Sequence, residues 1–279
     1  VYRVGANFAY NHNEVGNIPT LDGIIHGATN QIYQNAEEFY RAENGHAIGY
    51  FWGYKTAGLF QNQKEINDWI AAGNGIYQAD VKPGDVKYVD VNHDGVINAS
   101  DKVDLGNGLP KYTFGFNFSL AWKGFDLSAN FTGAAGFQIA QSYRDPSSSQ
   151  ANYSRRILKR WTGEGTSNEI PRVTYGDVGN WLFSDLYLQD GDYIRLQNLT
   201  MGYDFKKLIS WKGLSKMRLY FQVQNLFTLT KYDGMDPEIG SFNGTDGNSS
   251  DSWVSGVDMG YYPHPRTSVS YTHLTLPTS

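Results

Sequence analysis

The segment from Tyr112 to Trp122 alternates strictly between large apolar side chains and small or polar ones. Successive side chains of a β-strand point to opposite faces, so a period of two predicts a strand with one apolar face. The alternation restarts over Phe125–Ala135, and the two-residue break at Lys123-Gly124 predicts a tight hairpin. The first run is about as long as the roughly 9–11 residues with which a tilted barrel strand crosses a bilayer. Its apolar positions are Tyr112, Phe114, Phe116, Phe118, Leu120 and Trp122.

Further strands are expected along the chain, and their connections alternate in length. The expected strands are Val1–Asn11, the aromatic-rich Ala47–Leu59, Asp192–Phe205, Lys216–Phe227 and a truncated one that begins near His264. The short connections are Lys123-Gly124 and Lys206–Ser215, and the long ones are Phe60–Pro110, Phe137–Gly191 and Thr228–Pro263. Outer-membrane barrels have short periplasmic turns and long extracellular loops. The pattern therefore predicts an all-β, antiparallel transmembrane β-barrel fragment, and only Asn11–Gly45, a long connection on the short-turn side, does not fit.

Two short helices are expected inside the long loops. Asn62 followed by Glu65 forms a capping-box pattern, and apolar residues follow at helical spacing. Ser149–Trp161 also places apolar residues at helical spacing, with Arg and Lys between them. We interpret this basic run as a solvated face, and the alternative is an anion-binding or membrane-binding surface.

Composition narrows the classes of function. The formal net charge of −5 over 279 residues argues against a general nucleic-acid binder. The 20 Tyr, 15 Phe and 7 Trp are more aromatic residues than a soluble core needs. No apolar run approaches the roughly 18 residues of a membrane-spanning helix, whereas a barrel strand hides half of its residues in a polar lumen. The lack of Cys excludes disulfides and thiolate metal sites.

The two ends of the chain are unusual for different reasons. The chain begins at Val1, without Met or a signal peptide, and is already inside the first expected strand, which favours an internal piece of a longer protein over an end left by removal of a targeting segment. The last residues, Val269–Ser279, break the alternation and read VSYTHLTLPTS, which resembles the translation of a sequencing-library adapter. We therefore expect residues 1–268 to be natural and residues 269–279 to be a non-native tail.

One segment carries ligand chemistry, and it lies inside the loop Phe60–Pro110. Counted from Asp90 as position 1, oxygen-bearing side chains fall at positions 1, 3, 5, 9 and 12, Gly95 allows a sharp turn at position 6, and a carbonyl supplies position 7. The predicted ligands are Asp90, Asn92, Asp94, the carbonyl of Val96, Asn98 and Asp101. This is the layout of an EF-hand calcium loop, except that Asp101 stands where Glu is usual, which favours weaker binding. We expect a structural calcium ion that stiffens the loop, and the alternative is a polar turn that binds nothing.

Sequence motifs of catalysis are missing. The chain has no G-x-S-x-G elbow, no Walker loop and no H-E-x-x-H pair, and its six His are scattered singly. We therefore expect no catalytic residues and no enzymatic activity.

Several blocks together resemble the C-terminal part of SusC/RagA-type TonB-linked outer-membrane transporters, and their order and spacing match across residues 1–268. The blocks are Ile48–Gln63, Pro83–Asp101, Gly106–Phe131, Asp190–Tyr203, Leu219–Tyr232, Gly234–Glu238 and Gly260–Thr267. The family ends its closing strand with an aromatic residue where this chain has Ser279, and this departure agrees with a foreign tail.

The resemblance implies the last third or so of a 22-stranded barrel in a Gram-negative outer membrane, with long extracellular loops that contain short helices. The signal peptide, the segment that contacts TonB and the plug domain would lie upstream. It also implies import of oligosaccharides, or sometimes peptides, powered through TonB beneath a SusD-like surface lipoprotein that closes the mouth as a lid.

The alternative hypothesis is that the chain is a soluble, calcium-stabilised β-sandwich, such as an adhesin or a carbohydrate-binding module. It would share the calcium loop and the exposed aromatic residues. A sandwich should leave one face of each sheet wettable, however, whereas Tyr112–Trp122 has an unbroken band of bulky groups on one face. The medium that meets these rings therefore decides between the two hypotheses.

Overall fold

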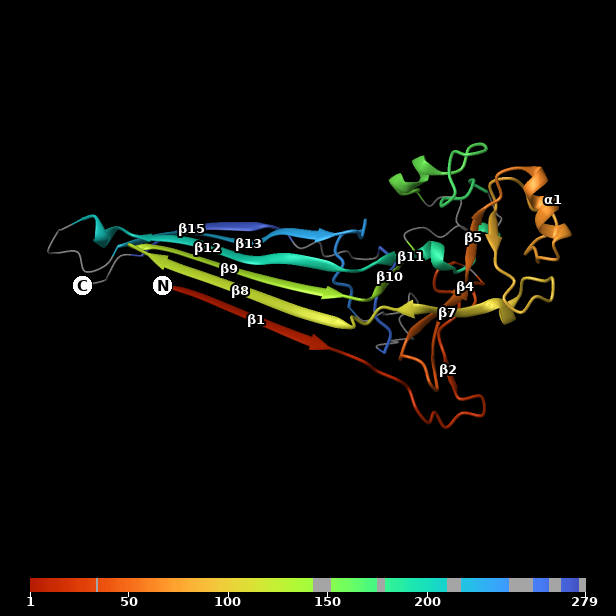
Figure 1. Ribbon diagram of the computed structural model, residues 1–279, viewed down its shortest axis with the longest axis horizontal. Helices are drawn as coiled ribbons and strands as arrows, with labels where there is room; N and C mark the ends of the chain where they lie inside the picture. Colours follow the sequence, from red (N-terminus) through yellow and green to blue (C-terminus); the bar gives the residue numbers. More distant parts are fainter. Residues whose placement is uncertain are drawn as a thin grey trace.

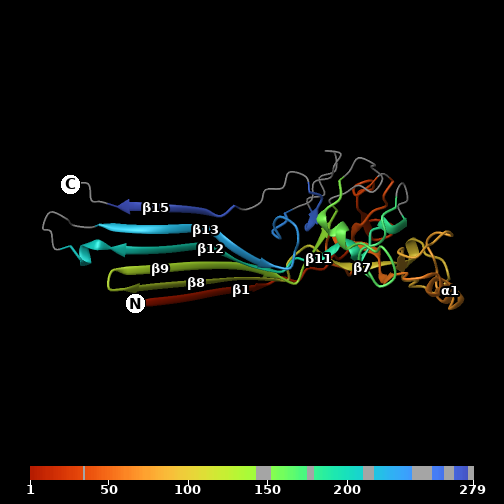
Figure 2. The same ribbon diagram turned by 90° about the horizontal axis from the view of Figure 1, so that it is seen from above.

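The computed structural model describes residues 1–33, 35–142, 152–174, 179–209, 217–240, 253–260 and 267–275. Its largest element is a six-stranded antiparallel sheet in the order β1-β8-β9-β12-β13-β15. These strands are β1 (Tyr2–Tyr10), β8 (Tyr112–Trp122), β9 (Phe125–Ala135), β12 (Tyr193–Asp204), β13 (Arg218–Thr230) and β15 (Val269–Thr275). The sheet forms one elongated layer that does not close on itself (Figure 1, Figure 2). The prediction of an antiparallel barrel fragment is confirmed.

The hairpin β8–β9 has the bounds that the alternation predicts. Its two turn residues, Lys123 and Gly124, have φ angles of 48° and 91°. Two-residue hairpin turns with positive φ at both positions match the right-handed twist of the flanking strands, and Gly adopts this conformation without strain. The sequence break therefore sets the register of the whole hairpin.

Register gives the large sheet one apolar and one polar face. Phe116 of β8 lies opposite Phe131 of β9, and the next residue, Asn117, lies opposite Asn130. Residues opposite one another point to the same face of the sheet. Because apolar residues of one strand lie opposite apolar residues of the next, they form one continuous apolar face. A β-bulge in β12 shifts its pairing with both β9 and β13.

The apolar face of the large sheet is uncovered. Its side chains include Phe8, Trp122 and Leu229, which are 68%, 64% and 61% exposed. Within the described residues, neither a second sheet nor a helix packs on this face. A β-sandwich would bury these rings between two sheets, so the fold does not support the sandwich hypothesis.

The short and long connections lie at opposite ends of the sheet, as predicted. Figure 1 shows the β8–β9 turn and the 3-10 turn η5 (Phe205–Lys207), which follows β12, at one end, and the connection from β1 to β8, residues 11–111, at the other. The described parts of the connections from β9 to β12 and from β13 to β15 also lie on that side. We call this end the loop region.

The prediction that Ala47–Leu59 forms a strand of the same sheet is wrong. β1 pairs directly with β8, and the segment forms β4 (Tyr50–Tyr54) and β5 (Thr56–Leu59) in two smaller sheets. Four of the five residues of β4 are buried, on both of its faces, so the strand has a core environment rather than one apolar and one wet side. With this strand removed, Asn11–Gly45 belongs to one long connection on the loop side and is no longer an exception.

The loop region is built from small sheets with their own cores. One has the order β2 (Ile24–His26), β3 (Tyr40–Glu43), β4 and β7 (Lys102–Asn107), a second pairs β5 with β6 (Val86–Tyr88), and a third has the order β11 (Leu188–Asp190), β10 (Gln138–Gln141) and β14 (Val257–Asp258). Buried side chains such as Phe51, Leu59 and Ile139 belong to three separate clusters here. The loop region therefore has the buried cores that the large sheet lacks.

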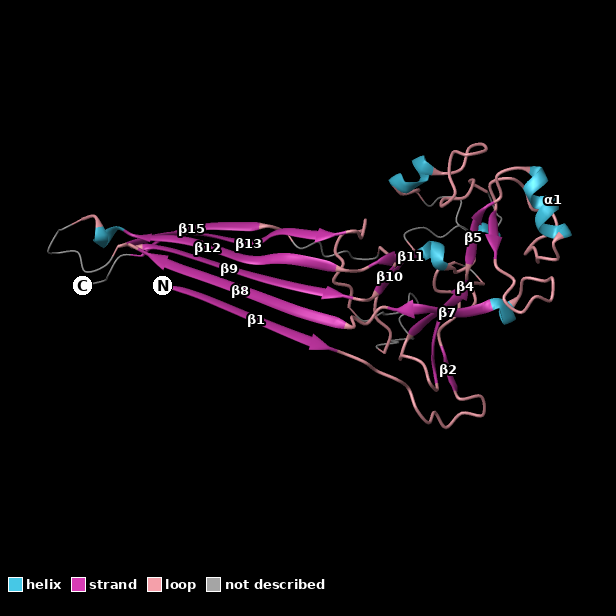
Figure 3. Cartoon of the chain, in the orientation of Figure 1, coloured by secondary structure: helices cyan, strands magenta, loops and turns pink. Residues whose placement is uncertain are grey.

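Of the two predicted helices, one is confirmed. Helix α1 (Gln63–Ala71) begins after Asn62, whose side-chain oxygen accepts a hydrogen bond from the backbone N–H of Glu65 at 2.9 Å. It lies at the far end of the loop region (Figure 3). The described part of Ser149–Trp161 contains only the 3-10 turn η2 (Arg155–Lys159), and residues 149–151 lie outside the described residues. None of the described helices has the length and apolar character needed to cross a membrane.

The last described strand, β15, pairs with β13 but inverts the pattern of the sheet. Its Thr272 lies opposite Phe221 on the apolar face, and its Tyr271 lies opposite Gln222 on the polar face. His264, where this strand was expected to begin, and residues 276–279 lie outside the described residues. The foreign origin of residues 269–279 stays a prediction.

Candidate metal centre in the loop region

The predicted calcium loop, Asp90–Asp101, curls around the carboxylate of its first residue. Asp90 is 3% exposed, and its Oδ2 accepts the N–H of Gly95 at 2.7 Å while its Oδ1 accepts that of Asp94 at 3.2 Å. Gly95 has a φ of 84°, which the sharp turn at position 6 requires and which a residue with a Cβ rarely adopts. The turn therefore brings residues 94 and 95 back onto residue 90.

The last residue of the loop closes it. Asp101 is completely buried, and its Oδ1 accepts the N–H of Val91 at 2.8 Å while its Oδ2 accepts that of Asn98 at 2.8 Å. Asn98 in turn caps the 3-10 turn η1 (Ala99–Asp101) through a bond from Ser100 N–H to its Oδ1 at 2.8 Å. Positions 9 and 12 of the predicted site are thus held together by hydrogen bonds.

The two middle side-chain positions face each other. Asn92 Nδ2 donates to Asp94 Oδ2 at 2.9 Å, and Asn92 Oδ1 accepts the N–H of Asp94 at 3.0 Å. Asp94 Oδ1 accepts the N–H of Val96 at 2.9 Å. The loop therefore supplies carboxylate, amide and carbonyl oxygens over one short curve, which is the donor chemistry that calcium takes.

An apolar anchor fixes the loop to the core. Ile97 is 4% exposed and belongs to a buried cluster with Leu59, Tyr88 and Leu182. The neighbouring Val96 forms a parallel β-bridge with Ile76. The carbonyl expected at position 7 thus sits on a backbone segment that two contacts hold in place.

The charge of the loop is not balanced by basic side chains. Within the described residues, none of Asp90, Asp94 and Asp101 forms an ion pair with Lys or Arg. Burial acts to raise the pKa of Asp90, but backbone N–H groups of Gly95, His93 and Asp94 outweigh it and lower that pKa below its usual 3.8. Carboxylates that have backbone N–H donors but no basic side chain as partners favour a cation nearby.

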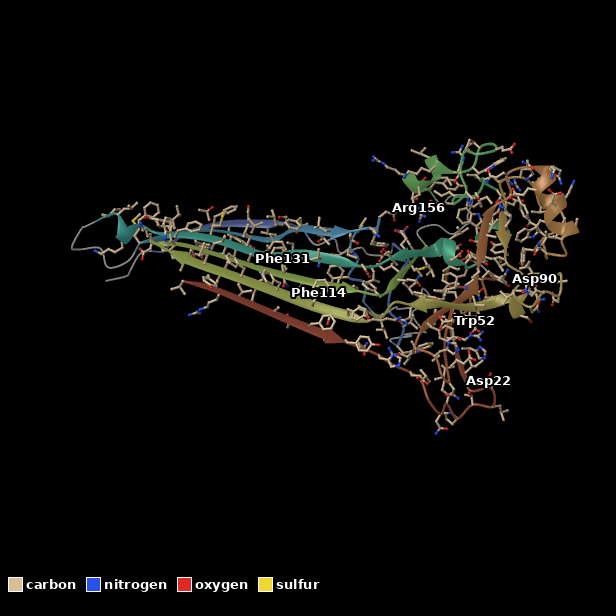
Figure 4. The ribbon with its side chains drawn as sticks, in the orientation of Figure 1. Asp22, Trp52, Asp90, Phe114, Phe131 and Arg156 are labelled. Atoms are coloured by element: carbon tan, nitrogen blue, oxygen red, sulfur yellow. The ribbon has the colours of Figure 1, made fainter. Side chains whose placement is uncertain are left out.

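The side chains of the loop do not form a tight acidic group as they stand. Among the described residues, no three His, Asp or Glu side chains gather closely enough to hold a metal ion. The oxygens of the loop bond to backbone N–H groups instead, but a carboxylate oxygen has a second lone pair for a cation. The donor set fits calcium in type and number, and the Asn side chains and the Val96 carbonyl would have to complete it. Figure 4 places Asp90 in the loop region, away from Phe114 and Phe131 on the large sheet.

Two buried ion pairs near the loops were not predicted from the sequence. Asp85, 2% exposed, accepts Arg172 Nε at 2.5 Å and Nη2 at 3.1 Å, and also Asn180 Nδ2 at 2.7 Å. Arg195 of β12, 1% exposed, donates to Asp236 at 2.7 Å and to Glu238 at 2.7 Å. Each pair joins segments far apart in sequence. The only mark of the second pair in the sequence is Arg195 itself, a charged residue in the polar register of β12.

The sequence of this chain is similar to those of curated TonB-dependent receptors. TonB-dependent receptor P3 of Formosa agariphila is 32% identical over 264 residues, which are 94% of this chain and 25% of the relative. TonB-dependent receptor SusC of Bacteroides thetaiotaomicron is 26% identical over 266 residues, which are 94% of this chain and 23% of the relative. The chain resembles SusC/RagA-type TonB-dependent receptors. It spans about a quarter of the length of these relatives, and no protein-family model matches it.

Solved structures agree on the fold. The RagAB peptide importer in its closed-closed state superposes with a TM-score of 0.63 and 20% identity, over 97% of this chain and 26% of that chain. Its open-open state gives a TM-score of 0.62 with 19% identity. At this identity the likeness establishes the fold alone. The open six-stranded sheet accordingly fits a fragment of a larger β-barrel.

Proposed function

We propose that this chain forms part of the barrel wall and extracellular loops of an outer-membrane, TonB-dependent transporter that imports oligosaccharides or peptides. The observation that carries the proposal is the uncovered apolar face of the six-stranded sheet. A row of bulky groups on one face and small polar groups on the other fits a wall between hydrocarbon and an aqueous lumen. The similarity to receptors named TonB-dependent supports it.

The partners follow from the same proposal. An upstream part of the protein would contain the segment that contacts TonB, and a SusD-like lipoprotein would cover the loop region. RagAB is named as a peptide importer, which supports a peptide as one solute class. The oligosaccharide is the other class that the resemblance to SusC/RagA-type transporters implies. The named relatives are receptors and importers, which supports transport rather than catalysis.

Two adjacent residues test which medium meets the apolar face. Phe116 points to the apolar face and Asn117 to the polar one. An Arg on the lipid side near the bilayer midplane costs about 2–4 kcal/mol, whereas a lumen position tolerates charge. We expect Phe116→Arg to reduce the amount of folded, heat-modifiable receptor in the outer membrane, and Asn117→Arg to preserve it. Equal behaviour of the two variants would refute the proposed orientation.

We also propose that Asp90, Asn92, Asp94, Val96, Asn98 and Asp101 bind a structural calcium ion that stiffens the loop region. The buried carboxylates without basic partners support this proposal. A shorter Asp at position 12 favours weak affinity, about 10⁻⁴–10⁻³ M, as in extracellular modules. Calcium at the cell surface would then be enough to occupy the loop.

The calcium proposal is tested by proteolysis of the longer receptor in detergent. We expect a chelator to speed cleavage within residues 60–110, and the double variant Asp90→Ala with Asp94→Ala to be cleaved fast with or without chelator. Asp68→Ala, an exposed acid on α1, is the matched control and should keep the chelator response. Cleavage that does not respond to chelator in the unaltered receptor would contradict the metal assignment.

A further inference from the structure

The apolar face of the large sheet ends in a row of aromatic side chains at the end opposite the loop region, which we call the short-turn end. Trp122 lies opposite Phe125 across the β8–β9 hairpin, and Phe125 lies opposite Tyr203 of β12. Trp122 is 64% exposed. Trp and Tyr are enriched where the hydrocarbon of a bilayer meets its headgroups, because each ring has an apolar body and a polar edge. The row therefore marks the level at which the sheet would leave the hydrocarbon.

A lysine at this level carries a charge without an acidic partner. Lys123, in the hairpin turn, is exposed, and its Nζ lies 5.1 Å from the centre of the Trp122 ring. Within the described residues, its ammonium group forms no ion pair with Asp or Glu. Asp126, the nearest acid along the chain, binds Arg218 instead, at 2.6 Å and 3.0 Å. The ring thus holds a cation at the edge of the apolar face, where an anion can reach it.

The turn η5 places further apolar side chains at the same end of the sheet (Figure 1). The carbonyl of Phe205 accepts the N–H of Leu208 at 2.9 Å and that of Ile209 at 3.0 Å, which fixes the turn. Leu208 and Ile209 are nonetheless 68% and 40% exposed. Apolar side chains are more stable outside water, so a non-aqueous environment at this turn would stabilise them.

Basic residues gather in the sequence of this second turn as well. Residues 205–217 contain four Lys and no Asp or Glu, although the whole chain has a net charge of −5. Residues 210–216 of this stretch lie outside the described residues. The acid before it, Asp204, accepts the N–H of Lys206 at 3.0 Å and caps η5. The short-turn end therefore combines an excess of basic residues with an apolar face.

We infer that the short-turn end of the sheet binds the headgroup of an anionic phospholipid. Lys123 Nζ contacts the phosphate group, Trp122 lies beneath the headgroup, and Leu208 and Ile209 meet the first part of the acyl chains. An acidic protein or a free anion would pair with Lys123 but would leave these apolar side chains in water. A zwitterionic lipid would bring its own cation to a basic surface, which repels it. The inference rests on the proposed function, because it needs hydrocarbon against the apolar face.

The experiment measures lipid binding to the longer receptor in detergent, by native mass spectrometry. Dimyristoyl-phosphatidylglycerol is the anionic probe, and dimyristoyl-phosphatidylcholine has the same acyl chains with a zwitterionic headgroup. Glycerol 3-phosphate has the phosphate without the chains. We expect phosphatidylglycerol to bind more tightly than phosphatidylcholine, and glycerol 3-phosphate at the same concentration not to displace it.

One substitution removes the charge and preserves the hairpin. Lys123 has a φ of 48°, which Asn adopts more readily than Lys, so Lys123→Asn should fold as the unaltered receptor does. We expect it to weaken phosphatidylglycerol binding about fivefold, the contribution of one basic side chain near an anionic surface, and to leave phosphatidylcholine binding unchanged. Lys64→Gln is the matched control, because Lys64 is an exposed Lys on α1 in the loop region, and it should change neither affinity.

Four results would overturn the inference: phosphatidylcholine binds as tightly as phosphatidylglycerol, Lys123→Asn leaves the phosphatidylglycerol affinity unchanged, Lys64→Gln weakens it as much as Lys123→Asn does, or glycerol 3-phosphate displaces the lipid. The pair Phe116→Arg and Asn117→Arg separates this failure from failure of the proposed function. If those two variants still differ in folded receptor, only the headgroup assignment is refuted. If they behave alike, the proposed orientation of the wall is refuted.

Discussion

Asp85 joins three segments of the loop region, so replacing it by Asn should loosen their contact. Its Oδ1 accepts Arg172 Nε and Asn180 Nδ2, and its Oδ2 accepts Arg172 Nη2 and the N–H of Lys82. In Asn, one of these two oxygens becomes an NH₂ group. Whichever way the amide is turned, that group faces at least two donors, and their hydrogen bonds are lost.

The magnitude follows from the burial of the carboxylate. Asp85 is 2% exposed, and the side chain of its partner Arg172 is 26% exposed. Each hydrogen bond to a charged group contributes about 1.5–3 kcal/mol, so losing two costs about 3–5 kcal/mol, the usual range when one partner of a buried pair is removed. The change also leaves the Arg172 guanidinium without its counter-charge.

Two backbone amides report this loss. Val86 N–H donates to Asn180 Oδ1 at 2.9 Å, and Arg172 N–H donates to the carbonyl of Gly84 at 3.0 Å. Their hydrogen exchange in the longer receptor should speed up by about 100-fold or more in Asp85→Asn. Asp68→Asn removes an exposed pair with Lys64 and should change exchange little, because such pairs contribute less than about 1 kcal/mol. If the two variants exchange alike at Val86 and Arg172, the reasoning is refuted.

Three further outcomes are expected. The chain by itself should show no cooperative monomeric melting in plain buffer, because the edges β1 and β15 and the whole apolar face would meet water; a single sharp monomeric transition by calorimetry would contradict this. Arg195→Met should lower the stability of the receptor by about 3–5 kcal/mol, because it removes the cation that pairs with Asp236; unfolding by denaturant measures this loss, and an unchanged midpoint would show that the ion pair does not stabilise the receptor. The hydrogen bond to Asp22, and then Glu38, raise the pKa of His26 above its usual 6.5. The contribution of protonated His26 to folding stability is therefore fully present below pH 6.5 and is lost as pH rises through the folded-state pKa. The protection factors of the β2 amides, which are the intrinsic exchange rates divided by the measured ones, should therefore fall above that pH, and His26→Asn should abolish this fall; protection factors that do not change with pH in the unaltered receptor would refute the assignment.

The sequence by itself determined the hairpin β8–β9, the strands β1, β12 and β13, and the two faces that they present. A period of two over Tyr112–Trp122 is a local property of the backbone, and the Lys123-Gly124 turn fixes the register, so no distant contact was needed to predict this hairpin. The helix after Asn62 and the curl of Asp90–Asp101 were also predictable, because a cap and a Gly turn act within a few residues.

Tertiary structure alone decided what the loops build. Ala47–Leu59 has the aromatic content of a strand, but its side chains belong to cores that also include distant residues such as Phe183 and Val254, and that environment places it outside the large sheet. The Asp85 and Arg195 ion pairs likewise depend on side chains that the sequence separates widely. Burial and pairing of such groups follow from the packing of whole segments, which no local pattern encodes.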